Sequence, residues 1–105
     1  MPSNLSKLYS MLGFAQKAGK VASGDGAVVE KIKRKEACLV IIASDAAEDT
    51  RNRAAVKARE NKIPCLTAGT KLELGLAVGK SPRALVALMD QNFANNITKL
   101  MTGGR

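Results

Sequence analysis

Two unbroken apolar runs constrain the fold of this chain more than any other feature. They cover residues 37–43 (ACLVIIA) and 84–89 (ALVALM). Neither run alternates apolar with polar side chains, which is typical of strands that are buried on both faces. Such strands belong to the interior of a sheet that carries a layer of helices on each side.

Helical and strand patterns alternate along the whole chain, without a linker or an internal repeat. Ser3 is a candidate N-cap for the first helix. Thr70 and Glu73 form a capping box, in which Glu73 reaches back to the cap. The predicted helices begin after Ser3, cover 27–36, run from about 50 to 61, and begin after Thr70 and Asp90. The predicted strands cover 20–23, 37–43, 65–68 and 84–89, and this order predicts a sheet between helices.

Three carboxylates, Asp45, Glu48 and Asp49, follow the first apolar run. We expect them to cap the next helix, because negative charge is favourable at a helix N-terminus. Arg51 and Arg53 begin the strongly basic part of that helix. For these two arginines, solubility and contact with a nucleic acid remain equal alternatives.

The composition predicts one globular domain over residues 1–105 with a polyanionic partner. The chain is 46% hydrophobic and has a formal net charge of +8. Such an excess favours nucleic acid as the partner. Its aromatic residues are Tyr9, Phe14 and Phe93, and we expect Tyr9 and Phe93 in the core. This is too few for the stacking platform of single-strand binders, so the expected partner is structured nucleic acid.

The sequence offers little for catalysis or for a cofactor. Histidine is absent, which removes the commonest general base and metal ligand. Cys38 and Cys65 lie in apolar surroundings and are interpreted as small core residues, not as metal ligands. Residues 13–20 (GFAQKAGK) lack the spacing of a phosphate-binding loop. We find no signal peptide and no membrane span, and therefore expect a cytoplasmic protein without cofactor, metal or membrane contact.

A glycine-rich turn before the helix over 27–36 is the clearest candidate site. Gly24, Asp25 and Gly26 allow the backbone to approach a partner closely, and Ala27 begins the helix. Because a helix N-terminus carries unpaired N–H groups, this turn suits a phosphate or the edge of a nucleobase. The alternative is an ordinary turn before a solvated amphipathic helix.

Three segments together resemble a known family. They are SGDGAVVEKIKRKEACLVIIASDA (23–46), IPCLTAGTKLELGLAVGK (63–80) and RALVALMD (83–90). The chain resembles the kink-turn-binding ribosomal proteins of the archaeal and eukaryotic large subunit and their small bacterial relatives. The resemblance implies a three-layer α/β/α sandwich around a four-stranded mixed sheet. It also implies RNA binding without catalysis, in which the target is a sharply bent duplex with tandem G·A pairs.

The resemblance also implies which residues contact RNA. The corresponding segments are 24–31, 46–51 and 80–83, with Lys71 near the phosphates. On the helix over 27–36 we favour Lys31 and Arg34, because residues three apart are neighbours. The expected RNA-binding residues are Gly24, Asp25, Gly26, Ala27, Lys31, Arg34, Arg51, Lys71, Lys80, Ser81 and Arg83.

The chain departs from the strongest kink-turn binders at three positions. Gly26, Ala27 and Glu30 stand where those proteins carry Asn, Glu and Lys. We expect Glu30 to pair with Lys33 or Arg34. The departures leave a second hypothesis open, a ribosome-associated module that binds a protein partner without specific kink-turn recognition. In either case we expect the free protein to be a monomer.

Overall fold

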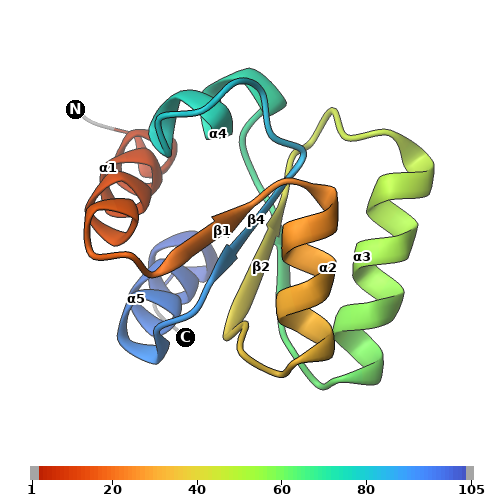
Figure 1. Ribbon diagram of the computed structural model, residues 1–105. Coiled ribbons are helices and arrows are strands. Elements are labelled where there is room, and N and C mark those ends of the chain that lie inside the picture. Colours follow the sequence, from red (N-terminus) through yellow and green to blue (C-terminus); the bar gives the residue numbers. More distant parts are fainter. Residues whose placement is uncertain (1–2, 104–105) are drawn as a thin grey trace.

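The computed structural model describes residues 3–103 as four strands and five helices in alternation (Figure 1). The helices are α1 (Asn4–Lys17), α2 (Asp25–Lys33), α3 (Glu48–Glu60), α4 (Lys71–Ala77) and α5 (Gln91–Thr102). The strands are β1 (Val21–Ser23), β2 (Leu39–Ile42), β3 (Cys65–Thr67) and β4 (Leu85–Leu88).

The sheet is mixed and has the strand order β1-β4-β2-β3. β4 is antiparallel to both β1 and β2, whereas β2 and β3 are parallel, with Val40 opposite Cys65. The inner strands β2 and β4 are buried at every position. The predicted interior strands are therefore confirmed, as is the edge strand near residues 20–23.

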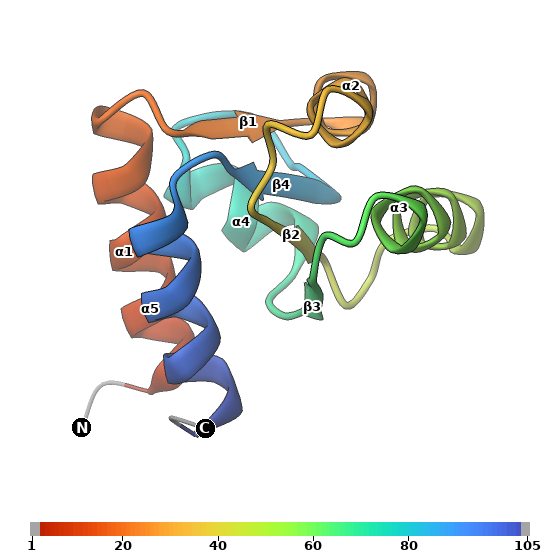
Figure 2. The same cartoon turned by 90° about the horizontal axis from the view of Figure 1, so that it is seen from below.

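Helices cover both faces of this sheet. Figure 2 shows α1 and α5 on one side and α2 and α3 on the other. α1 packs against both α5 and α4, and α2 packs against α3. The expected α/β/α sandwich with a four-stranded mixed sheet is thus the observed architecture.

Several element boundaries differ from the sequence-based expectation. The first apolar run forms a strand only over Leu39–Ile42, although Ala37 and Ala43 beside it are also buried. The helix expected over 27–36 covers Asp25–Lys33, so it starts two residues earlier and ends sooner. Lys35 ends it with a left-handed backbone (φ 59°), which pattern reading does not reveal for a lysine.

Both predicted helix caps, Ser3 and Thr70, are confirmed, and Asp90 caps the helix that was expected to start there. The side chains of Ser3, Thr70 and Asp90 accept hydrogen bonds from the N–H groups three residues later. The Glu73 half of the capping box takes a different role. Its Oε1 accepts from the Tyr9 hydroxyl (2.7 Å) and from the Thr70 hydroxyl (3.1 Å). A tertiary contact to α1 therefore engages the carboxylate that was expected to stay within α4.

Tyr9, Phe93 and both cysteines are partly buried and pack against the core. Cys38 and Cys65 are free thiols, and burial raises the pKa of the Cys65 thiol. Residues 3–103 contain no group of three or more potential side-chain ligands that could hold a metal ion. Within the same residues, no helix is both long and apolar enough to cross a membrane.

Candidate nucleic-acid interface

Strand direction brings four connections to one edge of the sheet, namely the edge formed by the C-terminal ends of β1, β2 and β3. β1, β2 and β3 run in the same direction, and β4 runs against them. The segments that follow the first three strands therefore meet the segment that precedes β4. We call this edge the tip and define it as residues 24–27, 44–51, 69–71 and 80–83. It brings together most of the RNA-binding residues that the sequence predicts.

The start of α2 is an open part of the tip. Gly24 has φ 96° and ψ 156°, a backbone region that is essentially restricted to glycine, and α2 has no side-chain cap. Val28 donates the first helical hydrogen bond to the Gly24 carbonyl (3.0 Å). The amides of Asp25, Gly26 and Ala27 therefore precede the helical ladder and are available to a ligand.

Gly26 faces open space. A Cβ atom placed on Gly26 would have no protein atom within 4 Å, and Gly26 is exposed together with its two neighbours. The Asp25 carboxylate accepts from the Thr50 hydroxyl (3.3 Å) at the start of α3. This contact turns the carboxylate toward α3, and the backbone of the first turn remains accessible.

Asp45 holds two connections of the tip together. Its Oδ1 accepts from the Lys71 N–H (2.8 Å), so it caps α4, not α3 as expected. The residue at the N-cap of α3 is Ala47, which makes no side-chain bond, while Glu48 and Asp49 lie in the first turn. The expectation for Asp45 was wrong because its helix partner lies 26 residues away in sequence.

Arg83 fixes the loop over 80–83 against β1. Its Nε donates to the Ser23 hydroxyl (3.2 Å), and its Nη1 donates to the Ser81 hydroxyl (2.8 Å). The Arg83 N–H donates to the Lys71 carbonyl (2.9 Å), which ties the loop to α4. We assign Arg83 a positioning role, since its guanidinium is engaged within the protein.

Gly75 explains part of the motif over 71–79 (KLELGLAVG). A Cβ atom on Gly75 would lie 2.3 Å from the Ser81 carbonyl oxygen, so the loop packs directly on the α4 backbone. The Lys80 N–H also donates to the Gly75 carbonyl (2.8 Å). This close approach sets the position of the exposed Lys80 and Ser81.

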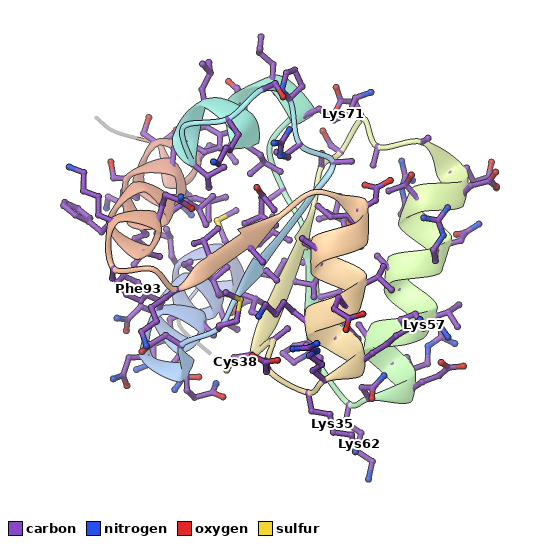
Figure 3. The ribbon with its side chains drawn as sticks, in the orientation of Figure 1. Lys35, Cys38, Lys57, Lys62, Lys71 and Phe93 are labelled. Atoms are coloured by element: carbon purple, nitrogen blue, oxygen red, sulfur yellow. The ribbon has the colours of Figure 1, made fainter. Side chains whose placement is uncertain are left out.

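The other cations of the tip differ in how far they are engaged. Arg51 donates from Nη2 to the carbonyls of Ser44 (3.3 Å) and Ala46 (3.2 Å), and so it braces the β2–α3 connection. Lys71 is exposed and lies beside that connection (Figure 3). Lys71 and Lys80 form no ion pair among residues 3–103.

Lys31 and Arg34 lie away from the tip. Lys31 is in the last turn of α2 and pairs with Glu36 (3.3 Å). Arg34 pairs with Glu30 (2.9 Å), which confirms the pairing expected for that glutamate. Lys31 is six residues beyond Asp25, so the helix carries it about 9 Å from the start of α2. The structure therefore does not bring these two cations together with the other candidates.

Tyr9 supports the tip from beneath. Besides its bond to Glu73, its hydroxyl would lie 2.7 Å from a Cβ atom on Gly69, in the turn before α4. Burial, followed by the hydrogen bond to and the negative charge of Glu73, raises the pKa of Tyr9 to about 12. The phenol therefore stays protonated and continues to donate over a wide pH range.

Sequence reasoning missed the exposed leucines of α4. Leu72 and Leu76 are 59% and 69% exposed, whereas Leu74 is fully buried. Residues two apart in a helix point about 200° apart, so the buried Leu74 places the other two outward. The capping box predicts where α4 begins, and the helical spacing then places Leu72 and Leu76 on one face and Leu74 on the other. This arrangement could therefore have been predicted from the sequence.

Most of the chain shows similarity to proteins of known description. Residues 6–98 match the family model of the ribosomal protein L7Ae/L30e/S12e/Gadd45 family. The RNA-binding protein YlxQ of Bacillus subtilis is 34% identical over 93 residues, which cover 89% of this chain and 93% of that protein. The large ribosomal subunit protein eL8 of Picrophilus torridus is 34% identical over 91 residues, covering 85% of this chain and 72% of that protein.

Solved structures show the same fold. A protein of unknown function from Bacillus halodurans C superposes with a TM-score of 0.87 and 30% identity, over 91% of this chain and 97% of that chain. The 15.5kD RNA-binding protein of Giardia lamblia superposes with a TM-score of 0.75 and 20% identity, over 92% of this chain and 83% of that chain.

Proposed function

The chain belongs to the ribosomal protein L7Ae/L30e/S12e/Gadd45 family, and we propose that its tip recognises a kink-turn or a similarly bent RNA duplex. Its ribosomal-protein-like character and its RNA-binding role follow from its family and its relatives. The proposal adds the class of RNA and the surface that contacts it.

The uncapped start of α2 carries this proposal. The Gly26 backbone is exposed, and it stands where the strongest binders carry an asparagine side chain. A helix N-terminus with free amides and no side chain in the way can approach base edges or phosphates closely. Recognition then depends on backbone N–H groups and on the shape of the bent groove.

The residues of the tip divide into contacting and positioning groups. Lys71 and Lys80 are exposed cations without an acidic partner among residues 3–103, and they contact phosphates. Arg51, Asp45 and Arg83 hold the connections in place through the hydrogen bonds described above. Phosphate contacts set register and orientation, while specificity comes from contacts with the bases and from RNA shape.

The proposal extends to the cellular role. Residues 1–105 act as one non-enzymatic RNA-binding domain in the cytoplasm, monomeric when free, with ribosomal RNA among the candidate targets. The absence of histidine, the commonest general base, supports the non-enzymatic role.

The test is a titration with a kink-turn RNA and with the same RNA after conversion of its G·A pairs to Watson–Crick pairs. Gly26→Leu places a bulky side chain over the open start of α2, and Gly26→Ala is the matched control. We expect the wild type and Gly26→Ala to prefer the kinked RNA, and Gly26→Leu to lose that preference by tenfold or more. Equal binding of both RNAs by the wild type contradicts the proposal.

A protein-interaction module is the second candidate, and the exposed Leu72 and Leu76 favour it. These leucines lie on the outer side of α4 beside Lys71. If the wild type does not distinguish the two RNAs, ribosome pelleting with Leu72→Ser/Leu76→Ser tests this candidate. Release of the variant from ribosomes supports it, and unchanged pelleting eliminates it.

A further inference from the structure

The opposite edge of the sheet carries a second surface, which we call the far end and define as residues 30–36 and 57–62. β2 and β3 are parallel and start at neighbouring positions, and the Val40 N–H donates to the Pro64 carbonyl (3.0 Å). The segments that precede these two strands therefore lie together. Figure 3 shows Lys35 and Lys62 at this end, away from Lys71.

The far end is strongly basic, whereas the tip is nearly neutral. Seven cations face three acids in the far end, which accounts for half of the net charge of +8. The three acids already have partners, since Glu30 and Glu36 pair with Arg34 and Lys31 and Glu60 pairs with Lys57. Four exposed cations have no acidic partner among residues 3–103, namely Lys33, Lys35, Arg59 and Lys62.

Two of these lysines occupy a backbone conformation that is unusual for their residue type. Lys35 and Lys62 both have φ 59° and follow the ends of α2 and α3. Glycine is the usual residue at such a position, because a Cβ atom makes the left-handed conformation unfavourable. Lysine therefore stands at both equivalent positions despite strain, and Figure 3 shows both lysines at the same end of the molecule. A functional role for charge accounts for this pair better than helix termination does.

We infer that the far end binds the phosphate backbone of an RNA segment other than the one held at the tip. α3 has 13 residues, so the two ends are separated by about 20 Å. The far end lacks the exposed glycine turn of the tip and offers ammonium and guanidinium groups, which suit phosphates without base readout. This inference goes beyond the tip contact and does not depend on its specificity.

The double variant Lys35→Gly/Lys62→Gly tests the inference. Glycine relieves both left-handed positions, so weaker binding cannot be attributed to a destabilised fold. The control is Lys7→Ala/Lys17→Ala, which removes the same charge from exposed sites on α1, across the sheet. The probe is a labelled straight RNA duplex, titrated against the free protein and against protein that has been saturated with unlabelled kink-turn RNA.

We expect the wild type to bind the duplex in both titrations. The far-end variant should bind at least tenfold more weakly at low salt and flatten the log–log salt dependence by about 2, one unit per lost phosphate contact. The control should change affinity less than about threefold. The affinity of the far-end variant for the kink-turn RNA should stay within about threefold of the wild-type value. Gly26→Leu should show the reverse pattern, with weaker binding of the kink-turn RNA and little change for the straight duplex.

Two results would overturn the inference. One is a far-end variant that binds the duplex as tightly as the control does, which would leave an acidic protein partner as the explanation of the cluster. The other is loss of duplex binding once kink-turn RNA is present, because both RNAs would then share one surface. If the protein does not prefer kinked RNA at all, the tip proposal fails, but the comparison of the two double variants on the duplex still decides the far end.

Discussion

The tip and the far end are both built from connections between helices and strands, yet they use opposite devices. The tip places a glycine in a conformation closed to other residues. Its loops are fixed by hydrogen bonds that Asp45 accepts and that Arg51 and Arg83 donate. The far end places lysines where glycine is usual and leaves four cations unpaired among residues 3–103. The difference indicates that the tip is built for shape and the far end for charge.

The largest effect is expected where the tip is packed most closely. Gly75→Ala places a methyl group 2.3 Å from the Ser81 carbonyl oxygen, and the obstacle is backbone that cannot rotate away. We expect a loss of about 1–3 kcal/mol in the free energy of unfolding, as for other overpacked sites. Urea denaturation measures the loss.

Gly13→Ala is the matched control for this prediction. It lies within α1, and its Cβ atom would meet the Ala77 carbonyl oxygen at an ordinary 3.6 Å. The control should be neutral or more stable by up to about 1 kcal/mol, because alanine is the better helix former. Equal stability of the two variants would show that the loop can move away from α4.

The second prediction removes a glycine from a positive-φ position of the tip and introduces one at a left-handed position of the far end. Gly24→Ala forces a side chain into a glycine-only region and should cost about 1–3 kcal/mol. Lys35→Gly removes strain of about 1 kcal/mol but gives the unfolded chain more freedom, so its net gain should stay below about 0.5 kcal/mol. Thermal unfolding compares them, and a destabilised Lys35→Gly variant would contradict the strain assigned to the far end.

The layers of the fold could be predicted from sequence, because burial on both faces leaves an unbroken apolar run and capping leaves a local signature. The contacts that build the tip could not. Asp45 bonds Lys71 across 26 residues and Arg83 bonds Ser23 across 60 residues, so no local pattern reports them. The position of Lys31 could have been predicted from the sequence, since the helix rise alone places it near the far end.

Glu30 provides the third prediction, since a substitution at this position distinguishes binding at the far end from binding at the tip. It pairs with Arg34, so Glu30→Lys adds a cation and leaves Arg34 only its longer contact with Glu36 (3.9 Å). We expect tighter RNA binding by about three- to tenfold at low salt, to straight and kinked RNA alike, with a salt dependence steeper by about 1–2. Selective tightening for kinked RNA would instead assign position 30 to the tip.

The smallest effect concerns the support beneath the tip. Tyr9 is the single tyrosine of the chain, so an absorbance titration reports it alone. Its pKa of about 12 in the folded protein exceeds the ordinary value of 10.0, so the protonated phenol is favoured by folding. This contribution to stability is complete below pH 10 and is lost as the pH rises toward 12.

Glu73→Gln identifies the source of this shift. The variant removes the negative charge but keeps an acceptor oxygen for the Tyr9 hydroxyl, so the Tyr9 pKa should fall toward 10 without reaching it, because burial is the larger cause. Unchanged titration would show that the negative charge of Glu73 does not contribute to the shift. Burial and the retained hydrogen bond would then account for it, and the tip would be held on α1 by that bond together with the packing of Tyr9 against Gly69.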